Sequence, residues 1–306
     1  MQRASNFDRE LMLPRYWITW FGISILFLIV CLPYPLLYRF GIWIGRCSMF
    51  FMKRRVFIVR RNLELCFPDM DKTHLAQSVK SNFESLGMGL LETGMAWFWS
   101  DRRVKKWFSV KGLEHLIAAH KPNRGILMIG LHFMSLELGG RAMGLCHPMT
   151  AIYRPHNNKL MEWVQTKGRL RSNKAMINRR NLRGAIHALK SGEIVWFAPD
   201  QDYGAKGTVF APLFSVPDVA TTSGTWVLAR LAQPALMTVV FLRKEDQSGY
   251  ELLIEREIQD YPLDDEMQAA RYINNIIEKE IMRAPSQYMW LHRRFKTRPA
   301  GMHSLY

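Results

Sequence analysis

The pattern of apolar and charged positions sets an N-terminal apolar segment apart from the rest of the chain. No charged residue occurs between Arg15 and Arg39, and this interval is about as long as the ~20 apolar residues that a helix needs to cross a bilayer. A signal peptide is the rival interpretation, but prolines and bulky residues follow the apolar run where small residues would be expected. We therefore predict an N-terminal tail at 1–15 and an uncleaved transmembrane helix at 16–38.

Flanking charge predicts the orientation of this helix. Basic residues are more numerous after the apolar segment than before it, with a dense cluster at 52–61. Because positive charge is retained on the cytoplasmic side, residues 39–306 are predicted to form a cytoplasmic domain behind a single-pass anchor. The basic cluster would then lie near an anionic membrane face.

The remainder of the chain alternates between strand and helix patterns. A helical pattern fills 72–98, and later helical candidates are 134–145, 157–170, 181–191, 221–232 and 264–283. Between them lie apolar, β-branched runs typical of strands, at 125–132, 149–154, 193–200, 235–244 and 250–258. This alternation predicts an α/β fold with a central, mostly parallel sheet flanked by helices.

Sites in such folds lie beyond the carboxyl ends of the strands. His132, Arg154 and Asp200 end three of the strand candidates, and Arg169 and Arg171 end the helix that follows the second of these strands. A histidine, a carboxylate and several guanidinium groups are therefore expected at one edge of the sheet.

His132 and Glu137 form a possible base and orienter. Five positions separate them, so on one regular helix they would point roughly 140° apart, and a strand-to-helix bend is needed to bring them together. Such a pair could deprotonate a hydroxyl. The chain has no GxSxG nucleophile motif, which makes a substrate hydroxyl the simplest nucleophile and acyl transfer the simplest reaction. Spacing alone favours the commoner arrangement, a polar pair that caps a helix.

Net charge predicts an anionic partner, and the spacing of histidine, carboxylate and cysteine residues argues against a metal site. The chain has 42 Lys and Arg against 26 Asp and Glu, a net charge of +16, which points to nucleic acid, an acidic carrier protein or anionic lipid. A merely basic surface and a membrane-tethered nucleic-acid binder remain alternatives. The spacing HxxxxE is not that of a metalloprotease, and the four cysteines lack zinc-site spacing. No metal and no cofactor are expected.

Several motifs resemble those of a known family. "HFMSLE" is similar to the HxxxxE/D box of glycerolipid acyltransferases, and the late acyltransferases of lipid A biosynthesis are resembled along essentially the whole chain, in "RRNLELCFP", "YRPHNN", "RLRSNKAM", "WFAPDQDYG" and "QYMWLHRRFKTRP". The resemblance implies a glycerolipid acyltransferase-like fold at the bacterial inner membrane. It further implies transfer from acyl-acyl carrier protein to Kdo2-lipid IV(A), with inner-membrane lipid but no nucleic acid as a partner.

The resemblance also implies roles for individual residues. His132 would be the general base, Glu137 its orienter, and Arg169 with Asp200 would shape the site or bind the acceptor. Phosphate oxygens of the acceptor suit arginine, and the candidates are Arg154, Arg169, Arg171, Arg293 and Arg294. The stretch "HFMSLELGGRAMGLC" is more similar to the palmitoleoyltransferase branch than to the lauroyltransferase branch, and a lauroyl donor is the alternative. Loss of the acyl chain to water would be a further activity.

Overall fold

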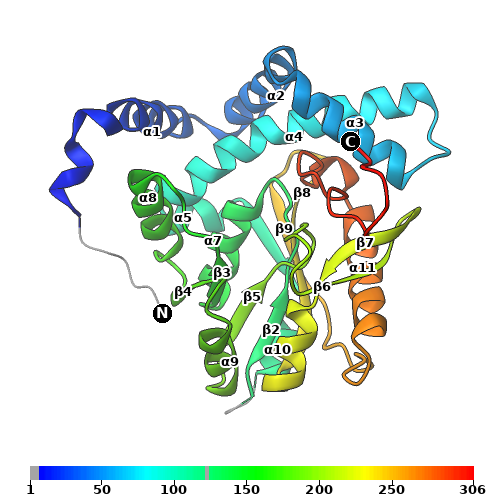
Figure 1. Ribbon diagram of the computed structural model, residues 1–306. Coiled ribbons are helices and arrows are strands. Elements are labelled where there is room, and N and C mark those ends of the chain that lie inside the picture. Colours follow the sequence, from blue (N-terminus) through cyan, green and yellow to red (C-terminus); the bar gives the residue numbers. More distant parts are fainter. Residues whose placement is uncertain (1–6, 121–123) are drawn as a thin grey trace.

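A central sheet flanked by helices forms the body of the computed structural model, which describes residues 7–120 and 124–306 (Figure 1). Within these residues a seven-stranded sheet has the order β1-β9-β8-β2-β5-β3-β4. Only β8 and β9 pair antiparallel in it. The predicted mostly parallel α/β sheet is therefore confirmed. The strands are β1 Phe108–Lys111, β2 Ile126–Ile129, β3 Thr150–Tyr153, β4 Ala175–Asn178, β5 Ile194–Phe197, β8 Ala235–Arg243 and β9 Tyr250–Ile254.

Each strand candidate from the sequence contains a strand of this sheet, because these strands are apolar along their length. All four residues of β2 are buried, as expected for a parallel strand covered by helices on both faces. The two missed strands of the sheet, β1 and β4, are its edge strands. A separate antiparallel hairpin, β6 Thr208–Leu213 with β7 Val216–Thr222, was also missed.

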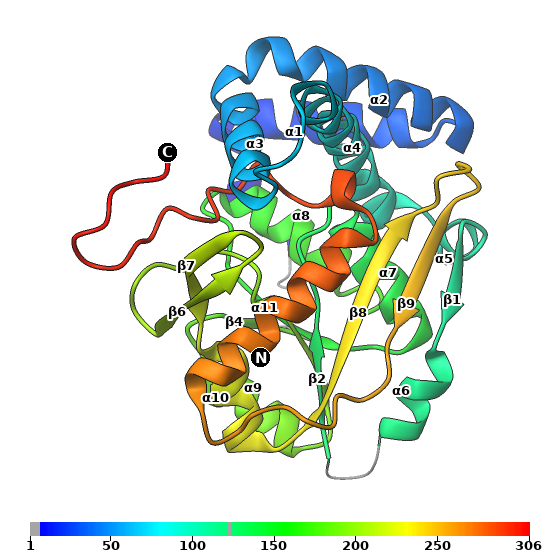
Figure 2. The ribbon, with the colours of Figure 1, turned by 90° about the vertical axis from the view of Figure 1, so that its right-hand side faces the viewer.

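Helices cover both faces of the sheet and form a layer along one end of it (Figures 1 and 2). All the helical candidates overlap observed helices, and Asp71, Asn158 and Asp265 cap three of these helices by accepting hydrogen bonds from backbone N–H groups. The helices are α1 Trp17–Val30, α2 Tyr34–Phe51, α3 Lys53–Cys66, α4 Lys72–Phe98, α5 Asp101–Lys105, α6 Leu113–Ala119, α7 Leu136–Cys146, α8 Lys159–Arg169, α9 Leu182–Lys190, α10 Gly224–Ala232 and α11 Glu266–Met282.

The predicted transmembrane helix at 16–38 is wrong. Helix α1 has 14 residues, or about 21 Å at 1.5 Å per residue, against a bilayer core of roughly 30 Å. The chain turns after α1, and Pro33 precedes α2 as its N-cap, because proline fits the start of a helix but not its interior. Among the described residues, no helix combines the length and the apolar character that crossing a membrane requires. The prediction of a single-pass inner-membrane protein, from which the cytoplasmic placement of residues 39–306 was derived, is therefore wrong as well.

The N-terminal helices instead pack on α4. A Cβ atom at Gly94 would lie 2.8 Å from side-chain atoms of Leu26 and Val30 in α1. The crossing of α2 and α4 is closer still, since a Cβ at Gly87 would lie 2.0 Å from the Gly41 carbonyl oxygen. Only glycine permits that backbone approach, so the segment expected to be a separate anchor shares its core with the α/β domain.

A buried ion pair joins α4 to the antiparallel strands. Glu92 is fully buried, and its Oε1 accepts hydrogen bonds from Arg243 Nε at 2.9 Å and Nη2 at 2.8 Å, and from the Tyr250 hydroxyl at 2.7 Å. Removing one partner of such a pair leaves the other charge buried without compensation. The contacts of Glu92 therefore fix the position of α4 on β8 and β9.

We expect Glu92→Leu to lower the free energy of unfolding by about 3–5 kcal/mol, because Arg243 would remain buried and uncompensated. The matched control is Glu84→Leu, also on α4, since Glu84 pairs with a half-exposed Arg46 at 2.7 Å; it should cost at most about 1 kcal/mol. Urea unfolding followed by far-UV circular dichroism measures both. Equal losses in the two variants would contradict the assigned role of Glu92.

Candidate active site

His132 and Asp200 lie side by side because their strands are neighbours. Strand β2 pairs in parallel with β5, and Ile129 stands opposite Phe197 at their carboxyl ends. His132 follows Ile129 by three residues, and Asp200 follows Phe197 by three. Both side chains therefore leave the sheet at the same level.

The two residues make a bidentate contact. The Nδ1 atom of His132 lies 2.7 Å from Asp200 Oδ1, and the backbone N–H of His132 donates to Asp200 Oδ2 at 2.8 Å. Asp200 is fully buried, whereas the His132 side chain is 19% exposed. Burial acts to raise the pKa of Asp200, but the charge and hydrogen bonds of His132 hold it below its usual range. An ionised Asp200 places the imidazole proton on Nδ1 and leaves Nε2 as a proton acceptor.

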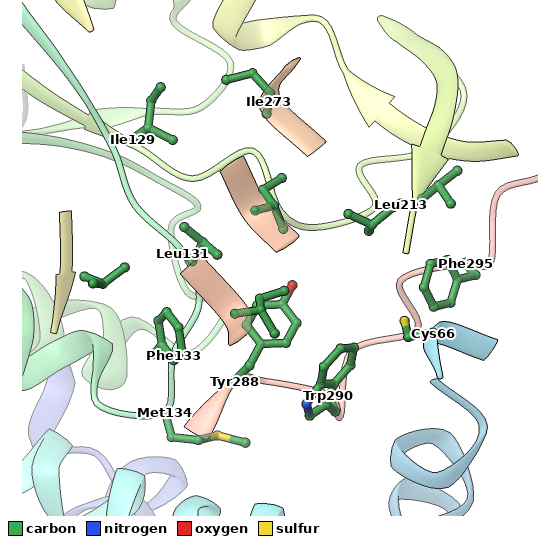
Figure 3. Close-up of a cluster of buried hydrophobic side chains, with 14 of the residues drawn as sticks. Cys66, Ile129, Leu131, Phe133, Met134, Leu213, Ile273, Tyr288, Trp290 and Phe295 are labelled. Atoms are coloured by element: carbon green, nitrogen blue, oxygen red, sulfur yellow. The ribbon is translucent and has the colours of Figure 1, made fainter. Parts of the chain in front are cut away.

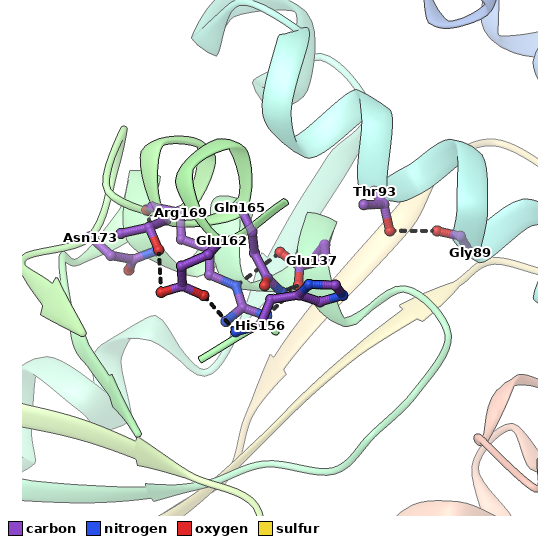
Figure 4. Close-up of polar contacts among 9 residues, drawn as sticks. Gly89, Thr93, Glu137, His156, Glu162, Gln165, Arg169 and Asn173 are labelled. Atoms are coloured by element: carbon purple, nitrogen blue, oxygen red, sulfur yellow. Dashed lines mark hydrogen bonds and ion pairs between the residues drawn. The ribbon is translucent and has the colours of Figure 1, made fainter. Parts of the chain in front are cut away.

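Glu137 is engaged by a different helix. It is the second residue of α7, and its Oε2 accepts from Arg169 Nε at 3.1 Å, while a second Arg169 N–H donates to Oε1 (Figure 4). Gln165 also donates to Oε1, at 3.1 Å. Burial acts to raise the pKa of Glu137, but the charge and hydrogen bonds of Arg169 lower it below its usual range. Glu137 is therefore an ionised carboxylate that side chains of α8 hold in place.

This arrangement differs from the expected pairing of Glu137 with His132. The strand-to-helix bend is present, as predicted, but Asp200 occupies the imidazole Nδ1. Helix α7 presents Glu137 to α8, where Gln165 and Arg169 stand four residues apart and thus on one face. Sequence reasoning missed Gln165. Its position four residues before Arg169 on the same helix is the signal that could have identified it.

An apolar cavity opens beside these groups. It has an empty volume of about 970 Å³, partly open to solvent, and lies between the inner face of α7 and the sheet. His132, Glu137, Arg154 and Arg169 line it together with many apolar side chains. Gly140 also lines it, and a Cβ at that position would meet no atom within 4 Å. Tyr153 and Asn173 also line it, and the apolar lining includes Leu131, Phe133, Leu136, Met143, Met149, Ala151, Ile152, Met176, Trp196, Val239, Val240, Phe241 and Leu252.

The arginines that sequence reasoning selected occupy different environments. Arg154 is exposed and lines the cavity, so it is free to meet an anionic group there. Arg171 is exposed, and one of its N–H groups donates to the Trp97 carbonyl oxygen. Arg294 is only 2% exposed and donates to the Ala220 carbonyl at 2.6 Å, so it does not reach a phosphate outside the protein.

The chain also matches known proteins along nearly its whole length. The family model for bacterial lipid A biosynthesis acyltransferases matches residues 4–297. A lipid A biosynthesis palmitoleoyltransferase of Escherichia coli K12 is 62% identical over 301 residues, covering 98% of this chain and 98% of its own. A lipid A biosynthesis lauroyltransferase of the same strain is 53% identical over 306 residues and covers both chains completely.

Among solved structures, a 1-acyl-sn-glycerophosphate acyltransferase from Thermotoga maritima matches with a TM-score of 0.39 at 15% identity. The match covers 83% of this chain and 96% of that chain.

Proposed function

Because the chain belongs to the bacterial lipid A biosynthesis acyltransferases and is therefore an acyltransferase, we propose that acyl-acyl carrier protein is its donor and Kdo2-lipid IV(A) its acceptor. The transferred chain is palmitoleoyl in this proposal, with lauroyl as the alternative. The higher identity to the palmitoleoyltransferase than to the lauroyltransferase, 62% against 53%, supports that choice. The net charge of +16 suits both an acidic carrier protein and a phosphorylated lipid.

One observation carries the proposed chemistry. His132 stands at the wall of an apolar cavity with Nδ1 held by a buried carboxylate. Its Nε2 is left to accept a proton, and the cavity beside it offers apolar surface to an acyl chain. Asp200 takes the orienting role that the sequence analysis had given to Glu137.

The proposed reaction is a direct transfer. The acceptor hydroxyl gives its proton to His132 Nε2 while its oxygen attacks the thioester carbonyl carbon. A C–O bond forms and the C–S bond breaks, and His132 returns the proton to the departing thiolate of the donor. Asp200 stabilises the transient imidazolium ion by its charge and by the bond to Nδ1.

The Glu137–Arg169 pair has a separate place in this proposal. Glu137 holds the Arg169 guanidinium at the cavity through two hydrogen bonds, and exposed Arg154 lines the same cavity. Two guanidinium groups can bind phosphate oxygens of the acceptor. Glu137 thereby positions an arginine. Arg171 does not line the cavity and is assigned to the surrounding basic surface.

Replacing His132 by Gln should reduce acyl transfer at least about 100-fold, because the general base is lost while the side chain stays polar. The assay follows transfer from palmitoleoyl-acyl carrier protein to Kdo2-lipid IV(A) by mass spectrometry. His187→Gln, a change at an exposed histidine of α9, is the control and should keep parental turnover. Near-parental turnover of a folded His132→Gln protein would exclude His132 as the base.

Replacing Gly140 by Leu should shorten the acyl chain that the protein accepts. The new side chain enters open space in the cavity without a clash at its Cβ, and leucine favours a helix over glycine by nearly 1 kcal/mol. We expect palmitoleoyl transfer to fall at least about tenfold, with lauroyl transfer less affected.

A panel of carrier-protein donors from lauroyl to palmitoleoyl, with the acceptor analysed by mass spectrometry, measures the change in preference. Gly22→Leu is the matched control, because Gly22 is a helical glycine of α1 that also has open space around its Cβ. Unchanged selectivity in folded Gly140→Leu would show that the acyl chain does not occupy this cavity.

A further inference from the structure

The C-terminal segment Gln287–Thr297 passes along the loop that carries His132. The backbone N–H of Met289 donates to the His132 carbonyl oxygen at 3.0 Å, and that of Met134 donates to the Gln287 carbonyl at 2.8 Å. Tyr288 lies beside Phe133 and Leu131 in the core around this crossing (Figure 3). The segment therefore fixes the backbone at His132 and immediately after it.

The same segment also holds the loop that carries Asp200. The Tyr288 hydroxyl donates to the Asp200 carbonyl oxygen at 3.2 Å. Two residues further, the Asp202 carboxylate accepts from the N–H and the hydroxyl of Thr297, both at 2.8 Å, and the Asp202 N–H donates to His292 Nε2 at 3.1 Å. One segment thus bonds to both halves of the His132–Asp200 pair.

A buried positive charge accompanies these contacts. Arg294 is 2% exposed, and one of its N–H groups bonds to Ala220, whereas its Nε and Nη2 have no hydrogen-bond partner within the described residues. A buried guanidinium with incomplete bonding is costly unless an opposite charge is near. The carboxylate that responds to this charge is Asp200: after His132, Arg294 contributes to lowering its pKa against the effect of burial.

We propose that Gln287–Thr297 is the positioning element of the His132–Asp200 pair and that Arg294 supplies the counter-charge that keeps Asp200 ionised while His132 is neutral. This inference rests on the proposed function insofar as a general base must be neutral before it reacts. Arg294 is then a positioning residue and not a phosphate-binding one.

The charge balance explains why a second cation is useful. In the proposed reaction His132 starts neutral, and at that stage Arg294 is a remaining cation whose charge lowers the pKa of the fully buried Asp200 carboxylate. When His132 takes up the proton of the acceptor, Asp200 faces two cations, and the excess positive charge favours return of that proton to the leaving group. Arg294 therefore resists premature protonation of the pair.

Other titratable groups surround the pair, and the test must hold them constant. They come from the C-terminal segment, the loop after β5, the end of α3, and the lining of the cavity with the end of β4. In that order they are Tyr288, His292 and Lys296; Asp202 and Tyr203; Cys66; and Glu137, Arg154, Arg169 and Arg179.

The test compares Arg294→Gln with Arg293→Gln. The glutamine at 294 removes the charge but retains a donor for the Ala220 carbonyl. The control removes a neighbouring arginine whose guanidinium lies over the Tyr306 ring, 4.8 Å from its centroid. The first readout is the titration of the His132 ring by NMR on histidine-labelled protein, with its resonance identified by its absence from His132→Gln. The second is the pH dependence of kcat/KM.

In Arg294→Gln we expect the titration midpoint of the pair and the acidic limb of kcat/KM to move to higher pH by about one unit. Arg293→Gln should titrate as the parent, and Arg294→Lys should restore most of the parental profile. Should Arg294→Gln not fold, a folded Arg294→Lys with the parental titration supports the proposal, and a shifted one overturns it.

Equal titration in the Arg294→Gln and Arg293→Gln proteins overturns the proposal. The NMR titration requires no turnover, so it can reject the proposed role of Arg294 without bearing on the proposed function. A shifted His132 titration together with normal transfer by His132→Gln would keep the inference about Arg294 and reject the proposed function.

Discussion

The parallel pairing of β2 with β5 is the constraint on which the site depends. It sets Ile129 opposite Phe197, so that His132 and Asp200 leave the sheet at one level and meet through two bonds. The cavity is placed by the same geometry, because α7 begins just after His132 and covers the sheet there. Strand register thus places the proposed base in the wall of the cavity that is proposed to bind the acyl chain of the donor.

Buried charges are compensated in different ways across the molecule. Glu92 is neutralised by Arg243 far from solvent and has a structural role. Glu137 and Arg169 compensate one another at the cavity, where the guanidinium stays 21% exposed. Asp200 bonds to the His132 ring, and the charge of the buried Arg294 also lowers its pKa, which suits this carboxylate to a change of charge on its partner. Burial and pairing together, rather than residue type, separate the structural carboxylate from those at the site.

Sequence reasoning placed His132 and Asp200 at one edge of the sheet but did not predict that they pair. Apolar runs mark the strands locally, and sites lie beyond the carboxyl ends of parallel strands. These two facts placed His132, Arg154 and Asp200 at one edge of the sheet. Sequence reasoning did not find the edge strands β1 and β4, because Ser109 and Lys111 interrupt the apolar residues of β1 and β4 has only three apolar residues before Asn178. The anchor was wrongly predicted because apolar content outweighed the prolines that end α1. The partner of His132 depends on which face of α7 bears Glu137 and on contacts with α8 (Figure 4), and neither follows from a five-residue spacing.

The central claim is that Asp200 holds His132 in the tautomer that accepts a proton at Nε2. The ¹⁵N chemical shifts of the His132 ring nitrogens in the full-length protein test it most directly, at a pH where the ring is neutral. The account predicts a protonated Nδ1 and an unprotonated Nε2 in the parent protein, unchanged by Glu137→Gln and lost in Asp200→Asn. A proton on Nε2 in the parent, or a tautomer that follows Glu137 and ignores Asp200, would contradict it.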